Sequence, residues 1–67
     1  MLNNQKFIIM KYYVSALNKV HGTQDIIAGF TSANKATEFG EKLAETGAKQ
    51  IKVVNETKMQ VIGAYNF

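Results

Sequence analysis

The sequence of 67 residues contains no cysteine, proline, tryptophan or arginine, and only one histidine. Without cysteine the chain has no disulfides, and a single histidine does not supply the ligands of a zinc site. The glycines are scattered and form neither a GxxxxGK[ST] nor a GxGxxG motif, so no phosphate-binding loop is expected. The apolar run FIIM is followed at once by Lys11 and is too short to cross a bilayer. We therefore expect one domain over residues 1–67, frayed at 1–5, with no metal, cofactor or membrane span.

All eight basic residues are lysines, and the net charge is +3. The planar guanidinium group of arginine makes bidentate hydrogen bonds to guanine and to phosphate. The absence of arginine therefore argues against base-specific recognition of DNA. Residues 31–47 carry two lysines and three glutamates, a net charge of −1, and the remainder carries six lysines with Asp25 and Glu56, a net charge of +4. Positive potential is therefore expected on the parts of the chain outside residues 31–47.

Residues 31–47, TSANKATEFGEKLAETG, have the pattern of one amphipathic helix. Thr31 or Ser32 can serve as N-cap, and Gly47 can adopt the left-handed conformation that ends a helix. The small side chains of Ala36, Gly40 and Ala44 predict a ridge that lets the helix approach a sheet closely. The apolar arc of this helix consists of Ala33, Ala36, Phe39, Gly40, Leu43, Ala44 and Gly47.

Four segments rich in β-branched and aromatic residues predict strands at 6–17, 26–30, 49–55 and 59–67. The order ββαββ and a right-handed crossover predict an α+β fold, a four-stranded antiparallel sheet of order 2-1-3-4 with one helix on one face. A sheet in which the second and fourth strands meet is the alternative. If the first hairpin turns at His21-Gly22 in a two-residue loop, Leu17 lies opposite Ile26, Ala16 opposite Ile27 and Tyr13 opposite Phe30; a longer loop shifts these pairs.

The first strand is apolar on both sides, although one helix covers only one face of the sheet. One row is unbroken and is expected to be fully buried, whereas Lys11 and Ser15 interrupt the other. A core of this size rarely supplies more than about 3–5 kcal/mol, so we expect an oligomer, most simply a homodimer with stacked sheets. A binding platform for another molecule is the alternative. The unbroken row is Ile8, Met10, Tyr12, Val14 and Ala16.

Neither candidate set for catalysis has the surroundings that its chemistry requires. Ser15, His21 and Asp25 lack a nucleophile elbow and an oxyanion loop, and are expected to be strand and turn residues. Glutamates 38, 41 and 45 alternate with lysines and are expected to form a solvated helix face. The chain is therefore expected not to be an enzyme.

The segments MKYYVSALNK, GFTSANKATEFGEKL and IKVV, with lysine in place of arginine throughout, resemble short proteins encoded by bacteriophages. This resemblance is one of pattern and composition, and it assigns no functional residue. It implies a non-enzymatic inhibitor of a host enzyme or defence protein, or a protein that sequesters signalling nucleotides, in the cytoplasm of a bacterial host.

Two functions are therefore expected from the sequence. The first is an oligomeric protein that binds another protein. The second is a binder of single-stranded nucleic acid or a nucleotide through lysines and aromatic residues on the sheet, with Phe7 and Tyr65 near the lysines. The predicted ligand or partner surface consists of Ile8, Met10, Lys11, Tyr12, Tyr13 and Lys52.

Overall fold

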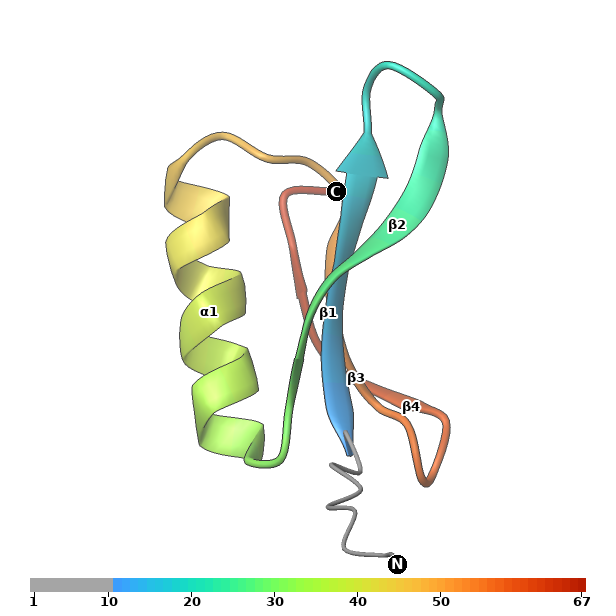
Figure 1. Ribbon diagram of the computed structural model, residues 1–67. Helices are drawn as coiled ribbons and strands as arrows, with labels where there is room; N and C mark the ends of the chain where they lie inside the picture. Colours follow the sequence, from blue (N-terminus) through green and yellow to red (C-terminus); the bar gives the residue numbers. More distant parts are fainter. Residues whose placement is uncertain (1–10) are drawn as a thin grey trace, which may run out of the picture.

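The computed structural model describes residues 11–67, which form one sheet and one helix (Figure 1). The strands pair in the order β2-β1-β3-β4, and all neighbours are antiparallel. This confirms the predicted ββαββ fold and strand order and excludes the alternative in which β2 and β4 meet. The elements are β1 (Tyr12–Asn18), β2 (Thr23–Phe30), α1 (Ala33–Glu45), β3 (Ile51–Asn55) and β4 (Gln60–Tyr65).

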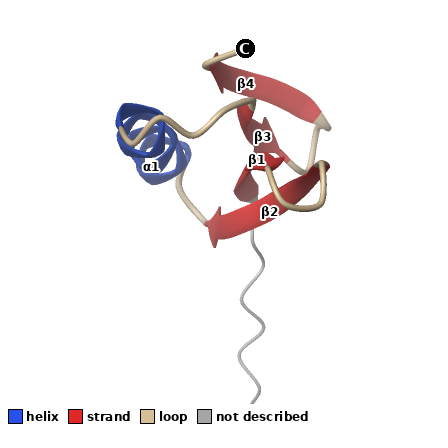
Figure 2. Ribbon diagram, turned by 90° about the horizontal axis from the view of Figure 1, so that it is seen from above, coloured by secondary structure: helices blue, strands red, loops and turns tan. Residues whose placement is uncertain are grey.

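The helix packs on one side of a twisted sheet (Figure 2). Viewed from above, β1 and β3 lie in the middle, β2 and β4 cross them at the two edges, and α1 lies to one side. No helix among residues 11–67 covers the other side of the sheet. The sheet therefore has a helix-covered face and a second face without such a cover.

Both ends of α1 have the capping groups that the sequence predicts. Ser32, rather than Thr31, is the N-cap, and its Oγ accepts a hydrogen bond from the Lys35 backbone N–H at 3.4 Å. At the other end, Gly47 has φ +91° and donates its N–H to the Ala44 carbonyl at 3.0 Å. The left-handed glycine satisfies a carbonyl that the helix itself leaves unpaired.

The core lies between α1 and the two central strands and is made of small residues. Val14 and Ala16 from β1 are buried in it, which confirms the predicted burial for these two members of the unbroken row. Tyr12 packs against the same cluster, whereas Ile8 and Met10 lie outside the described residues. Among residues 11–67, the largest side chains that are fully buried are an isoleucine and two valines, and no aromatic ring is fully buried. The buried cluster is Val14, Ala16, Ala36, Ile51 and Val53.

The predicted register of the first hairpin is wrong, because the loop between β1 and β2 has four residues. Asn18 pairs with Thr23, Leu17 with Gln24 and Tyr12 with Phe30. The Asn18 side-chain oxygen accepts hydrogen bonds from the backbone N–H groups of Val20 at 2.9 Å and His21 at 3.2 Å. These two bonds organise a wider turn than a His21-Gly22 reversal. As a result β2 begins at Thr23, three residues before its predicted start.

Each edge strand contains one residue that has no partner on the neighbouring strand. In β2 the register shifts between Val14 and Ser15, which pair with Ala28 and Ile26 and leave Ile27 unpaired. In β4 the shift lies between Val53 and Val54, which pair with Gly63 and Val61. Ile62 is therefore the extra residue of the second bulge. A bulge bends its strand and increases the local twist.

Candidate binding surfaces

The face of the sheet opposite α1, called the open face below, follows from the strand pairing. Side chains alternate along a strand, so Tyr13, Ser15 and Leu17 of β1 point away from the helix that Val14 and Ala16 contact. Residues paired across antiparallel strands share a face, which adds their partners on β2, β3 and β4. The open face consists of Tyr13, Ser15, Leu17, Gln24, Ile26, Gly29, Lys52, Val54, Val61 and Ala64.

The two edges of the open face expose large apolar side chains. Ile26 on β2 is 62% exposed and Val61 on β4 is 55% exposed, and Ala64 is also exposed. In the middle, Ser15 and Val54 are buried by their neighbours, although no helix covers them. A solvated face of an antiparallel sheet is normally polar. At its edges the open face is therefore more apolar than a solvated face of an antiparallel sheet usually is.

The Ser15 hydroxyl, in the middle of the open face, has a hydrogen-bond partner within the chain. The Gln24 Nε2 donates to the Ser15 Oγ at 3.1 Å and to the Gln50 backbone carbonyl at 2.6 Å. Among the described residues no buried side-chain N or O atom lacks a hydrogen-bond partner. The middle of this face can therefore be covered by an apolar surface without leaving the Ser15 hydroxyl unpaired.

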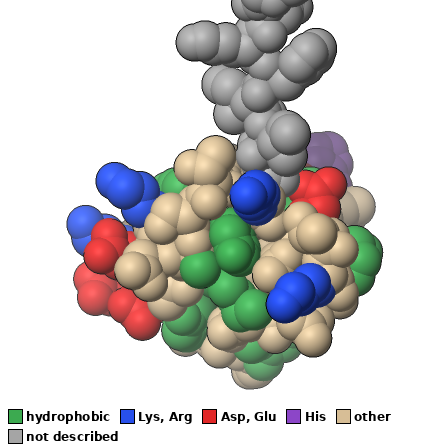
Figure 3. Space-filling model, turned by 90° about the horizontal axis from the view of Figure 1, so that it is seen from below, with side chains coloured by type: hydrophobic (Ala, Val, Ile, Leu, Met, Phe, Trp, Pro, Cys, Tyr) green, Lys and Arg blue, Asp and Glu red, His purple; other side chains and the backbone are tan. Residues whose placement is uncertain are grey.

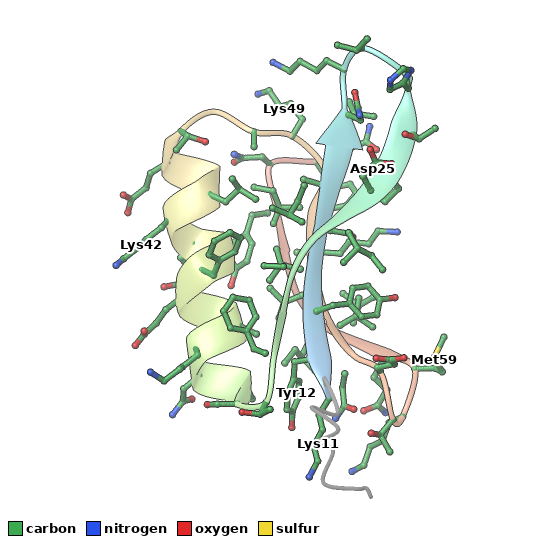
Figure 4. The ribbon with its side chains drawn as sticks, viewed as in Figure 1. Lys11, Tyr12, Asp25, Lys42, Lys49 and Met59 are labelled. Carbon is green, nitrogen blue, oxygen red and sulfur yellow. The ribbon has the colours of Figure 1, made fainter. Side chains whose placement is uncertain are left out.

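The residues of the predicted ligand surface lie on different sides of the sheet. Tyr13 is on the open face, but Tyr12 packs against the core on the helix side. Figure 4 shows the Tyr12 side chain near the N-terminal end of α1, and Lys11 extending away from the sheet. Ile8 and Met10 lie outside the described residues. Of the four members of this set within residues 11–67, Tyr13 and Lys52 lie on the strands of the open face itself.

Lys11 directly precedes β1 and Lys52 lies on the neighbouring strand β3, but the two are not opposite each other. Lys52 pairs with Ser15, and the Lys11 carbonyl accepts a hydrogen bond from the Glu56 backbone N–H at 2.8 Å. Four residues of extended chain, about 13 Å, separate the two positions along the sheet. The Lys52 Nζ lies 5.9 Å from the centroid of the Phe67 ring. An anionic ligand that contacts both lysines must therefore extend along the strands.

The groups considered for catalysis or metal binding do not converge. Ser15 is on the open face, whereas Asp25 pairs with Ala16 on the helix side and His21 lies in the hairpin loop. Glutamates 38, 41 and 45 are exposed on α1, and Figure 3 shows acidic side chains gathered on the side where the helix lies. Within residues 11–67 there is no group of three or more His, Cys, Asp or Glu side chains that could hold a metal ion.

Asp25 forms a local hydrogen-bond network beside the hairpin loop. Its carboxylate accepts from the Thr23 hydroxyl at 2.7 Å and from the Asn18 amide at 2.8 Å. Both bonds hold the pKa of the Asp25 carboxyl below its ordinary value of 3.8, and the bond from Thr23 has the larger effect. The same Asn18 side chain organises the loop. The ionised form of Asp25 therefore supports the hairpin.

We expect this network to make stability depend on pH in acid solution. A carboxyl whose folded pKa is lowered stabilises the fold above its unfolded pKa, and this contribution is lost as the pH falls through the lower folded value. The melting temperature of the wild-type protein should therefore fall between about pH 6 and about pH 2.5 by more than that of the Asp25→Asn variant. Thermal unfolding followed by circular dichroism measures both. Glu41→Gln on the helix is the control, and equal pH dependence in all three proteins would contradict the role of Asp25.

Comparison with protein families, with curated proteins and with solved structures finds no match to this chain. Within the described residues no helix is both long and apolar enough to cross a membrane. Sequence reasoning did not include Ile26, Val61 and Ala64 in the predicted surface. The predicted register already put Ile26 opposite Leu17, on the face that it shares with Ser15 in the structure, so the register error is not the cause.

Proposed function

We propose that this chain is a small, non-enzymatic binding protein that works as a homodimer, in which two open faces pack back to back about a twofold axis. The observation that supports this proposal is the exposure of Ile26 and Val61 on a face without a helix. In a dimer of this kind the same patch of each subunit meets its copy.

The small core gives a second reason for a dimer. Its buried members are two valines, one isoleucine and two alanines. Burial of apolar surface contributes roughly 25 cal/mol per Å², so a core of small residues supplies little of the stabilisation that folding requires. Covering the open face would add the apolar burial of Ile26 and Val61, which the single chain leaves exposed.

The charge of the open face is compatible with self-association. Lys52 is its one charged member, and its amine lies near the Phe67 ring rather than beside another cation. Lys52 lies on the central strand β3, between Ser15 and Ala64. A long lysine side chain can bury its methylene groups along an apolar surface while its amine extends towards water.

We further propose that the dimer binds and blocks a protein in the cytoplasm of a bacterial host, the role implied by the resemblance to short bacteriophage proteins. With the open faces in contact, the two helices point outward. The exposed face of each helix carries Glu38, Glu41 and Glu45 together with Lys35 and Lys42, a net charge of −1. The corresponding surface on the partner is expected to be basic, and raised salt should weaken its binding.

The homodimer is tested by its mass and by its concentration dependence. Light scattering at high micromolar concentration should give twice the monomer mass of 7.5 kDa. The melting temperature should rise with protein concentration, because dissociation accompanies unfolding. Ile26→Lys and Val61→Lys place a charge in the proposed interface, and each should shift the mass to that of the monomer.

Val20→Lys is the matched control, because Val20 is 86% exposed in the hairpin loop, outside the open face. This variant should keep the wild-type mass. A monomeric wild-type protein whose melting temperature does not change on dilution would refute the dimer. Equal loss of the dimer in Val20→Lys would show that the open face is not the interface.

A further inference from the structure

A shallow pocket lies on the flank of α1, at the point where β2 ends and the helix begins its second turn. Its volume is about 230 Å³, and its lining is Phe30, Lys35, Glu38, Phe39 and Lys42. We propose that this pocket binds a small ligand that joins a planar aromatic ring to an anionic group, the chemistry of a nucleoside monophosphate.

Two aromatic rings form the apolar part of the pocket. Phe30 is the last residue of β2 and Phe39 lies in the middle of α1, and their ring centroids are 5.4 Å apart at an interplanar angle of 48°. Both side chains pack against the buried core and remain half exposed. The core therefore holds the rings in place, and a planar ligand ring can stack on the exposed part without ordering them first.

Charged groups on α1 border the same pocket. Lys35 and Lys42 are seven residues apart, about 10.5 Å along the helix axis, and Glu38 lies between them. Lys42 extends from the helix into solvent, where its amine can reach a phosphate at the rim (Figure 4). The Glu38 carboxylate can accept hydrogen bonds from ligand hydroxyl groups. Two cations and one anion give a lining with net charge +1, which favours an anionic ligand.

The volume restricts the ligand to a small one. Pockets for drug-sized molecules measure about 300–1,000 Å³, so this pocket accommodates one ring system, and the remaining groups of the ligand lie at the rim near the lysines. Phe30 pairs with Tyr12 on the helix side of the sheet. The pocket is therefore separate from the open face, and the proposed dimer leaves it accessible.

The experiment is an NMR titration of the ¹⁵N-labelled full chain with adenosine 5′-monophosphate at low salt. Amide shifts should concentrate at Phe30 and at residues 35–42. A double variant with Lys35→Gln and Lys42→Gln should bind the nucleotide at least about fivefold more weakly, because charge-assisted contacts to the phosphate are lost. Lys11→Gln with Lys52→Gln removes the same charge from the sheet and should leave the affinity unchanged.

A second variant separates the aromatic contribution from the charge. Phe39→Leu keeps an apolar side chain in the core but removes the ring face, and it should weaken binding of the nucleotide while the amide spectrum stays dispersed. Equal binding of inorganic phosphate alone, or of uncharged adenosine alone, would overturn the proposal of a combined site. Absence of shifts at residues 35–42, or loss of binding in the Lys11 and Lys52 variant instead, would also overturn it. None of these outcomes depends on whether the chain is a dimer.

Discussion

Replacing Gly40 with alanine is expected to destabilise the protein by up to about 2 kcal/mol, although alanine in a helix interior is about 1 kcal/mol more favourable than glycine. A Cβ atom at Gly40 would lie 2.8 Å from the Val53 Cγ2 and 3.2 Å from the Tyr65 Cε2. Val53 is fully buried, and its β-branched side chain has little rotamer freedom to move away. The cost of overpacking, about 1–3 kcal/mol, therefore exceeds the gain in helix propensity. Denaturant unfolding at a fixed protein concentration measures the difference.

A double-mutant cycle tests whether the Val53 side chain causes the destabilisation of the Gly40→Ala variant. Val53→Ala removes the methyl group that the new Cβ would meet, and alone it should cost about 2–3 kcal/mol through the cavity it leaves. In the Gly40→Ala, Val53→Ala double variant the alanine Cβ occupies part of that space. The double variant should therefore be at least about 1 kcal/mol more stable than the sum of the single effects predicts. Additive effects, or a higher melting temperature for Gly40→Ala alone, would contradict close packing at Gly40.

Replacing Asn66 with alanine is expected to lower stability by about 2 kcal/mol. The Asn66 side-chain amide donates to the carbonyl of Ala44 at 3.0 Å and to that of Ala48 at 2.8 Å. Asn66 also has φ +56°, a left-handed conformation that asparagine tolerates better than alanine. The side chain therefore joins the residue after β4 to the C-terminal end of α1, and alanine loses both the bonds and the preferred backbone conformation.

Asn66→Gly separates the two contributions, because glycine keeps the left-handed conformation but lacks the amide. Urea unfolding should place this variant between the wild-type protein and Asn66→Ala. Asn34→Ala, which changes an exposed asparagine in the first turn of the helix, is the control and should change stability by no more than about 0.5 kcal/mol. If Asn66→Ala also changed the free energy of unfolding by no more than about 0.5 kcal/mol, the contacts to Ala44 and Ala48 would not contribute to stability.

Strong local signals explain why the sequence predicts the element order, the strand order and the small-residue side of the helix. The periodicity of residues 31–47 and the caps at Ser32 and Gly47 define α1, and the handedness of the crossover then leaves few sheet orders. The hairpin register failed because the turn is organised by the Asn18 side chain and because Ile27 is an extra residue in β2. A bulge has no distinct pattern in a strand that is apolar on both sides.

The candidate sites were less predictable than the fold because they depend on tertiary placement. Tyr12 and Tyr13 are adjacent and chemically alike, yet strand alternation puts one against the core and the other on the open face. The flank pocket joins Phe30 at the end of a strand to residues of the helix, and only the packing of Phe30 against Phe39 brings them together. Sequence spacing alone does not contain that contact.

The two bulges have a consequence for how copies of this chain can add to one another. An edge strand exposes unpaired backbone groups and can template the strand of another molecule, which leads to fibres. Ile27 interrupts the regular spacing of these groups in β2, and Ile62 interrupts it in β4. A strand added at either edge would need a matching interruption to remain in register. The chain is thereby protected against open-ended growth of its sheet, and this protection is important for a sequence without proline and with apolar residues on both edges.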